Sequence, residues 1–243
     1  MSGFTPMAAL QSIAVVNGMP TIYGDGMLAL VRASGLLEDI IETIVRISIL
    51  AGFPTIVEFA LMADGVAPDK VYETLGTPEG VDRAFKKLDT IKKDVIWWEA
   101  GAQPPQLLAD GEVSMAFAFN GRIFNAAQGE GKPFKIVWDG QIYEMEGWVI
   151  PKGAPDLDAA KEFIAFSTAP EQQARAAEFI SYGPPRVSAA ALVGNIEGTD
   201  VPMGPNLPTF ADNMKQALGS NQEFWVDHDA ELAERFNAWL AAK

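Results

Sequence analysis

The sequence predicts an α/β protein whose sheets are at least partly parallel. Segments with the composition of strands alternate along the chain with segments whose apolar residues recur at helical spacing. Such alternation is typical of helices that pack on a parallel sheet. The 243 residues are 49% hydrophobic and 21% charged, as expected for a chain that folds around a core.

The N-terminal part is expected to form a small α+β segment. A short helix is predicted at 5–12, and two β-rich runs flank a turn at 17–20. A helix capped by Asp25 follows. Apolar residues then keep a helical period from 36 to 45, but the acidic residues among them argue against a membrane span.

From residue 54 helices and strands alternate. Thr77 is expected to cap a helix, Pro54 and Pro78 suit first-turn positions, and Gly111 suits a helix end. The helices are expected at 54–63, 67–75, 77–94, 104–111, 122–129, 156–167, 169–180, 209–218 and 222–242. The strands are expected at 95–98, 112–121, 134–138 and 142–151. Residues 183–208 are rich in Pro, Gly and Asn and are expected to form an irregular connection.

Charge and tryptophan are unevenly distributed. The formal net charge is −14, of which residues 53–243 carry −12, and all six Trp lie after residue 96. This asymmetry predicts a seam near residues 42–53. So acidic a chain is a poor general binder of nucleic acid, because binding to phosphates needs a basic surface. The charge suits a cationic ligand, or it serves solubility alone.

The residue types exclude several kinds of catalytic site. The chain has no Cys and a single histidine, His228, so neither a Cys-type zinc site nor a multi-His metal site can form. The stretch 128–134, "QGEGKPF", lacks the spacing of a phosphate-binding loop, and no G-x-S-x-G pattern occurs. We therefore expect neither a metal site nor a cofactor. A Ser–His–Asp triad is not formally excluded, but His228 is expected at the surface.

The stretch "DGQIYEMEGWVIPKG", residues 139–153, carries an unusual pair of acidic residues. In a strand, Glu144, Glu146 and Trp148 would share one face. Carboxylates beside aromatic faces suit an ammonium group, with each cation–π contact contributing ~0.5–2 kcal/mol. An exposed strand face and a cation-binding cage are both compatible with this pattern.

Residues 54–243 resemble the C-terminal half of the solute-binding proteins of bacterial ABC transporters, and most closely the spermidine/putrescine type. Segments that carry the resemblance include "WWEAGAQPPQLLADGEVSMAFAFNGRIFNAA" and "FWVDHDAELAERFNAWL". The resemblance implies an incomplete α/β clamshell of the type II periplasmic-binding-protein kind. It would comprise the second lobe and the return segment of the first lobe.

The resemblance also implies roles for individual side chains. Phe119 matches an aromatic residue that stacks on the ligand's methylene chain, Glu146 matches an acidic residue that pairs with an amine, and Tyr182 matches a further pocket residue. Glu144 stands where spermidine binders tend to have an aromatic residue, so this position departs from the family pattern. The ligand-binding positions implied in this way are Phe119, Asn120, Glu144, Glu146, Tyr182, Trp225 and Asp227.

Residues 1–45 resemble a different family, the RecT phage recombinases that anneal single-stranded DNA. The similar pattern is "GFTPMAALQSIAVVNGMP" followed by "YGDGMLALVR". The basic DNA-binding surface of that family is missing, since Arg32 is the only basic residue within 1–42. The two resemblances together imply an extra N-terminal α+β segment fused to part of a solute-binding protein.

The function expected from these resemblances is that of a truncated substrate-binding component of an ABC transporter for polyamines, a binding protein and not an enzyme. The implied partners are a small cationic amine and a membrane permease, and nucleic acid is not expected. The alternatives are a fragment of a DNA-annealing recombinase or a non-functional fusion product. Location in the periplasm is implied, although the N-terminus has no basic region typical of a signal peptide, so a cytoplasmic location stays open. Because half of the clamshell is missing, we expect weak or no binding.

Overall fold

Parallel strands form the main sheet in the computed structural model, which describes residues 47–50 and 55–242. Within these residues the strand order is β2–β1–β3. The strands are β1 (Ile47–Leu50), β2 (Val95–Trp98) and β3 (Met115–Ala116). Parallel neighbours need a crossover connection, which helices supply between β1 and β2. The predicted α/β class with parallel pairing is confirmed.

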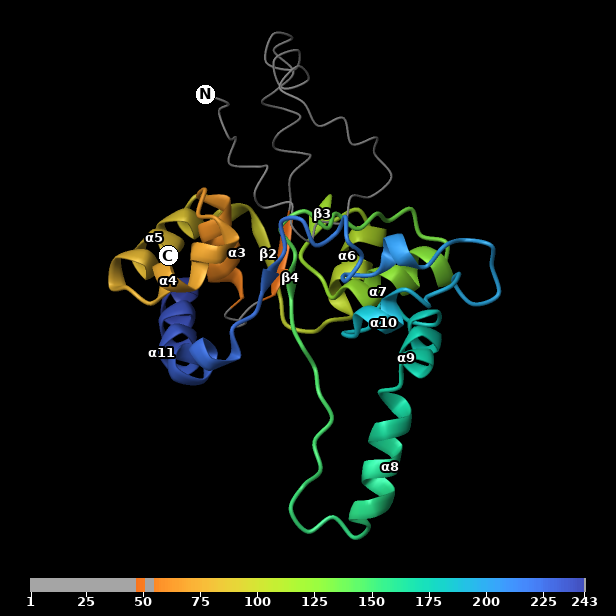
Figure 1. Cartoon of the computed structure of the whole chain (residues 1–243). Coiled ribbons are helices and arrows are strands. Elements are labelled where there is room, and N and C mark those ends of the chain that lie inside the picture. Colours follow the sequence, from red (N-terminus) through yellow and green to blue (C-terminus); the bar gives the residue numbers. More distant parts are fainter. Residues whose placement is uncertain (1–46, 51–54, 243) are drawn as a thin grey trace.

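Helices lie on two sides of these strands. Figure 1 shows α3, α4, α5 and α11 gathered on one side and α6, α7, α9 and α10 on the other. The α-helices are α3 (Ile56–Ala63), α4 (Val71–Leu75), α5 (Pro78–Asp89), α6 (Gln103–Ala109), α7 (Asn120–Phe124), α8 (Leu157–Ser167), α9 (Pro170–Ala177), α10 (Val187–Ala190) and α11 (Gln222–Ala241). Short 3₁₀ turns lie at Pro68–Lys70, Lys92–Asp94 and Gly204–Asn206, and a π-helical turn lies at Asn125–Gly129.

The larger core lies on the α3 side. Every residue of α3 is buried, and α5 packs on it with Ala84, Phe85 and Leu88. The last helix, α11, closes this core by placing Phe236 at 5.7 Å from the ring of Trp97. The core therefore joins α3, near residue 60, to the C-terminal helix α11. Both helices are thereby held on the same side of the sheet.

Two smaller cores lie on the other side of the strands. Leu108, Val113 and Ile123 form the centre of one, and Phe124 and Met203 belong to the other. These clusters hold α6 and α7 against the connection that follows α9. The loops that leave β3 and α9 are thereby brought together.

A second, smaller parallel pair crosses between the two sides. It consists of β4 (Ile142–Tyr143) and β5 (Leu218–Gly219). Just before β4, the buried Gln141 donates hydrogen bonds from Nε2 to the carbonyl oxygens of Pro208 and Asn213, at 2.8 and 2.9 Å. This side chain joins the start of β4 to the loop that precedes β5.

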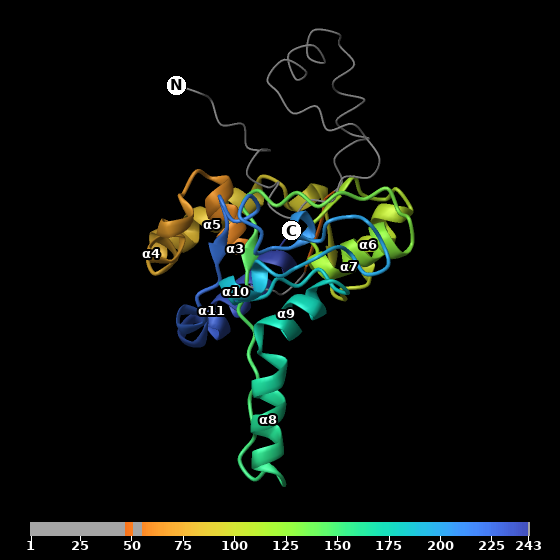
Figure 2. The ribbon, with the colours of Figure 1, turned by 45° about the vertical axis from the view of Figure 1, so that its right-hand side comes forward.

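An arm, residues 147–167, projects from the body of the protein. Figures 1 and 2 both show α8 and the extended segment before it pointing away from the other helices. No residue of α8 is buried. Large apolar side chains on the arm are exposed: Trp148, Val149, Leu157, Phe163 and Phe166. The arm therefore has a solvated apolar surface that the described residues do not cover.

Most helices lie where the sequence predicts them. The side chain of Thr77 accepts a hydrogen bond from the Gly80 amide at 3.1 Å, so the predicted cap of α5 is confirmed. Gly111 has φ +71° just past the end of α6, as its predicted position requires. The predicted role of Pro54 lies outside the described residues, as do the elements expected before residue 46.

Two predicted elements are wrong, and two predicted strands are shorter than expected. Residues 134–138 hold only an isolated bridge at Ile136 in place of a strand. Residues 209–218 form turns that lead into β5, because Asn213 donates from Nδ2 to the carbonyl oxygen of Leu207 at 2.7 Å and folds the chain back. The strands expected at 112–121 and 142–151 shorten to two residues each, since pairing is available only there. Within the described residues, no helix is long and apolar enough to cross a membrane.

Candidate functional site

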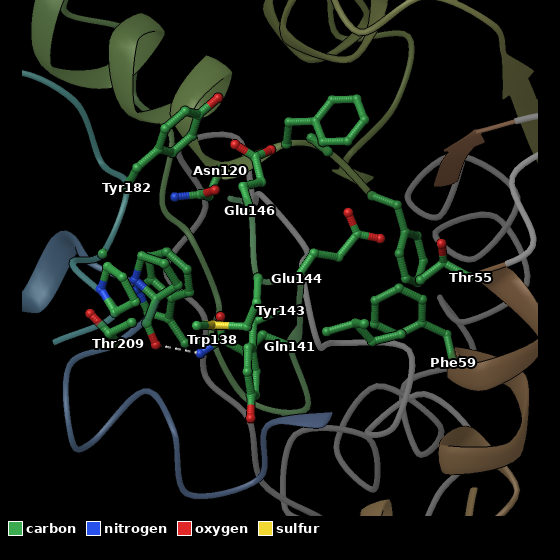
Figure 3. A pocket seen from close by; sticks show the side chains of 18 of the residues that line it. Thr55, Phe59, Asn120, Trp138, Gln141, Tyr143, Glu144, Glu146, Tyr182 and Thr209 are labelled. Carbon is green, nitrogen blue, oxygen red and sulfur yellow. Dashed lines mark hydrogen bonds between the residues drawn. The ribbon is translucent and has the colours of Figure 1, made fainter. Parts of the chain in front are cut away.

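A cavity of about 380 Å³ lies where the two sides of the protein meet. One wall comes from the start of α3, with Thr55 and Phe59, and the other comes from the loop that begins α7. The segment that follows β4 crosses between these walls, as Figure 3 shows. Because each wall belongs to a separate core, the cavity spans the junction between two packed units.

Glu144 and Glu146 are the acidic residues among the described cavity lining. Both side chains are exposed, and they follow directly after β4 ends at Tyr143. In Figure 3, Glu146 lies beside Asn120, whereas Glu144 extends towards Phe59. The two carboxylates thus reach different ends of the same cavity, although the chain is no longer a strand at these positions.

The α7 wall presents aromatic side chains to the cavity. Phe119 is 50% exposed and packs edge-on against Trp98, with ring centroids 6.2 Å apart. Tyr182 is also half exposed and lines the cavity. Between them, Asn120 donates from Nδ2 to the backbone oxygen of Ser181 and to its Oγ at 3.1 Å. Asn120 therefore holds the loop that carries Tyr182 against α7.

Close packing fixes the side of the cavity near Thr209. A Cβ added to Gly183 would lie 2.1 Å from the Thr209 Oγ1 atom. Only glycine permits this approach, and both residues line the cavity. The Gln141 hydrogen bond to Pro208 fixes the residue that precedes Thr209. This side of the cavity is preorganised by contacts that need no ligand.

Behind the α3 wall lies a buried carboxylate that the sequence did not indicate. Glu58 is fully buried, and its Oε1 accepts hydrogen bonds from the Tyr72 hydroxyl and from Trp225 Nε1, the latter at 3.1 Å. Its Oε2 has no hydrogen-bond partner among residues 55–242. Burial raises the pKa of Glu58 to about 7; the two hydrogen bonds oppose this change, and the charge of Glu144 adds to it. Burial and the charge of Glu58 also raise the pKa of Tyr72.

Five of the seven residues predicted from the sequence line this cavity. They are Phe119, Asn120, Glu144, Glu146 and Tyr182. Trp225 and Asp227 lie on α11 outside the lining; Trp225 donates to Glu58, and Asp227 is exposed. Their role in ligand binding stays a prediction, as does that of the five lining residues.

The expected shared face of Glu144, Glu146 and Trp148 does not form. Trp148 lies on the arm, is 60% exposed, and packs edge-on against Phe163 with ring centroids 5.3 Å apart. The alternation of side chains fails because pairing with β5 stops at Tyr143. The aromatic residues around the carboxylates come instead from Trp138, just before β4, and from the distant Phe59, Trp98 and Tyr182.

Several lining residues were missed by sequence reasoning. Trp98 and Trp138 stand out in the sequence only through the uneven distribution of tryptophan, and Phe59 looks like an ordinary core residue. Gln141 has no local signal, because its partners at 208 and 213 are about 70 positions away. These residues can be recognised as cavity lining only once the three-dimensional contacts between the loops are known.

The composition of the cavity restricts its chemistry. Among its described lining residues there is no Lys, Arg or His, and the polar groups are two carboxylates, amides and hydroxyls. Within the described residues no group of three or more His, Cys, Asp or Glu could hold a metal ion. Carboxylates beside aromatic rings favour a cationic ligand with an apolar portion.

Comparison with known proteins identifies the family. Residues 49–209, more than half of the chain, match the family described as bacterial extracellular solute-binding protein. The chain belongs to the bacterial extracellular solute-binding proteins. Members of this family are non-enzymatic transport components, so the prediction that the chain is not an enzyme is confirmed.

Individual relatives are similar over part of their length. The gamma-aminobutyric acid-binding protein of Pseudomonas aeruginosa is 48% identical over 184 residues, which are 76% of this chain and 50% of that protein. The solved structure of the Atu4243 GABA receptor has a TM-score of 0.64 and 33% identity, and the match covers 82% of this chain and 58% of the receptor.

A third relative carries a bound ligand. The structure of the PBP MotA from A. tumefaciens B6 in complex with glucopine has a TM-score of 0.69 and 26% identity, and the match covers 94% of this chain and 68% of MotA. The α/β fold of the solute-binding proteins is therefore present. The chain spans about half the length of the curated relative that it matches. The predicted RecT-like segment, residues 1–45, precedes the family match and lies outside the described residues.

Proposed function

We propose that the chain binds a small amine as part of the substrate-binding component of an ABC transporter. This proposal departs from the weak or absent binding expected from a half clamshell, because a lined cavity is present. The observation that carries this proposal is the pair Glu144 and Glu146 in an aromatic cavity whose described lining has no basic side chain. Each carboxylate can accept charge-assisted hydrogen bonds from an ammonium group. Aromatic side chains such as Phe119 and Tyr182 would cover the carbon chain between the charged ends.

Gamma-aminobutyric acid is one candidate ligand. Two similar proteins are named for binding it. Its ammonium group suits either carboxylate, but its own carboxylate would find no cationic partner in the described lining. Recognition of that end would therefore depend on neutral donors or on groups outside the described residues.

A diamine such as putrescine is the second candidate, and the charge of the cavity favours it. Glu144 and Glu146 extend towards different ends of the cavity, so each could pair with one ammonium group of a short diamine (Figure 3). This is the polyamine specificity expected from the sequence. A membrane permease would be the protein partner and the periplasm the place of action, as in the family at large.

Titration with matched ligands tests this proposal. We expect putrescine, spermidine and gamma-aminobutyric acid to shift amide resonances of cavity residues such as Asn120 in a saturable manner. Butyrate has the same carbon chain but no amine, and it should leave these resonances unchanged. Equal responses to butyrate and to the amines would contradict the proposal.

A further inference from the structure

Glu58 is set apart from the other carboxylates by its burial and by its position beside the cavity. It lies on α3 between Ile56 and Phe59, both of which line the cavity, but Glu58 itself faces the opposite side. Its side chain is 0% exposed, and none of the described residues places a cationic group within hydrogen-bonding distance of it. A buried, unpaired carboxylate is strongly disfavoured in its charged form.

The hydrogen bonds of Glu58 are unequally divided between its two oxygens. Oε1 accepts from Tyr72 on α4 and from Trp225 on α11, whereas Oε2 accepts from none. Protonation on Oε2 would leave both bonds to Oε1 in place and remove the buried charge. The geometry therefore suits a carboxylic acid whose proton sits on Oε2.

The same group is connected to the cavity wall through the backbone. The Tyr72 hydroxyl accepts a hydrogen bond of 2.8 Å from the amide of Asn221, which caps α11 directly after β5. Strand β5 pairs with β4, and Glu144 follows β4 immediately. Glu144 is also the one charged residue of the cavity lining whose charge acts on Glu58. The ionisation of Glu58 therefore depends on the charge of Glu144.

We propose that Glu58 is a proton-exchanging residue that sets the affinity of the cavity for cations. A cation bound at Glu144 offsets the negative charge that favours the acid form of Glu58. Glu58 then loses its Oε2 proton to solvent and becomes a buried carboxylate, no longer opposed by the uncompensated charge of Glu144. By linkage, the affinity for a cation rises with pH as Glu58 ionises. The ligand-dependent part of this inference rests on the proposed function.

The groups around Glu58 decide how the experiment is designed. From α3, α4, α11 and the segment after β4, the titratable or polar groups that act on Glu58 are Tyr72, Trp225 and Glu144. His228 stacks on Phe224, with ring centroids 4.4 Å apart, and lies on the same helix as Trp225. Because histidine ordinarily titrates near neutral pH, the measurements use a His228→Gln background.

The Trp225 indole N–H reports the charge of Glu58 directly, since it donates to Oε1. In ¹⁵N-labelled protein its resonance, assigned by the Trp225→Phe variant, is followed from pH 5 to 9. We expect one transition with a midpoint near 7, its loss in Glu58→Gln, and a lower midpoint in Glu144→Gln. Glu112→Gln, an exposed site away from the cavity, should leave the midpoint unchanged. Two outcomes would overturn the coupling between Glu58 and Glu144 before any ligand is added. One is no pH transition of the Trp225 resonance in the His228→Gln protein, and the other is the same midpoint with and without Glu144→Gln.

The second part of the test repeats the pH titration with saturating putrescine, and NaCl at matched ionic strength is the control. We expect the midpoint to fall by at least half a pH unit, which corresponds to a roughly threefold rise in affinity from low to high pH. If putrescine shifts cavity resonances but leaves the Trp225 midpoint unchanged, the inference fails and the proposed function stands. If putrescine shifts no resonance, the proposed function fails, and the ligand-free midpoints alone decide whether Glu58 and Glu144 are coupled.

Discussion

The indole N–H of Trp225 donates a hydrogen bond of 3.1 Å to the carboxylate of Glu58, 167 positions earlier in the chain. This bond joins the C-terminal helix to α3, whose other side lines the cavity. It places a buried ionisable group between the larger core and the binding site. The pH dependence of stability should therefore report on the same residue as ligand binding.

Glu58 should make the protein less stable as the pH rises. Its pKa is about 7 in the folded protein against 4.5 for the free group. The folded state thus keeps a proton that the unfolded state has lost, and the stabilisation present below pH 4.5 disappears as the pH rises to about 7. The contribution is roughly 3 kcal/mol.

Urea unfolding at several pH values measures this effect. Between pH 4.5 and 7 the free energy of unfolding of the wild type should fall relative to that of Glu58→Gln, which has no proton to lose. Parallel pH profiles for the two proteins would show that Glu58 does not hold a proton in the folded state.

Gln141→Leu should destabilise the junction between β4 and the loop before β5. The substitution keeps the volume but removes the donor for the carbonyl oxygens of Pro208 and Asn213. Leaving buried acceptors unpaired costs about 1–3 kcal/mol. Urea unfolding should show this loss, whereas Gln106→Leu, at an exposed site on α6, should change stability by less than ~0.5 kcal/mol. Equal effects of the two substitutions would contradict the assigned role of Gln141.

Gly183→Ala should disturb the cavity itself. The added Cβ would meet the Thr209 side chain at 2.1 Å, so one of the two loops must move, at a cost of about 1–3 kcal/mol. Gly147→Ala is a matched control, because a Cβ there has no neighbour within 4 Å. Thermal unfolding should separate the two variants; indistinguishable melting temperatures would mean that the Gly183 approach is not a close one in solution.

The apolar surface of the arm should bind a hydrophobic dye. Phe163 and Phe166 are 54% and 62% exposed on α8, where no residue is buried. The double substitution to Ser should lower the fluorescence of the dye ANS markedly, because contiguous apolar surface is removed. Val226→Ser removes a single exposed apolar residue of α11 and should have little effect. Unchanged fluorescence in the double variant would show that the arm is covered.

The sequence predicted helices better than strands, for reasons visible in particular residues. Local signals such as the Thr77 cap and Gly111 suffice to bound a helix. The ends of β4 depend on where β5 pairs with it, about 75 positions later, and nothing in "IYEMEGWVIP" encodes that limit. Residues 209–218 look helical by composition, but the side-chain bonds of Asn213 turn the chain.

The candidate site was predictable where family resemblance placed a residue, as with Phe119 and Glu146, and less so elsewhere. Glu58 looks like one of many helical glutamates, because its burial depends on helices that come 14 and 167 positions later. Periodicity also placed Trp148 beside the carboxylates, although it lies on the arm. The positions of Glu58 and Trp148 therefore depend on contacts between segments that are far apart in the sequence.

The most direct test of the proposed amine site is a titration of the wild type, Glu144→Gln, Glu146→Gln and Glu112→Gln with putrescine, followed by amide chemical shifts. Loss of one charged partner of an ammonium group costs about 1 kcal/mol or more, so we predict at least ~fivefold weaker binding in each cavity variant. Glu112→Gln should bind like the wild type. Equal affinity in all four proteins, or no saturable shift in the wild type, would contradict the account of Glu144 and Glu146 as the amine-binding groups.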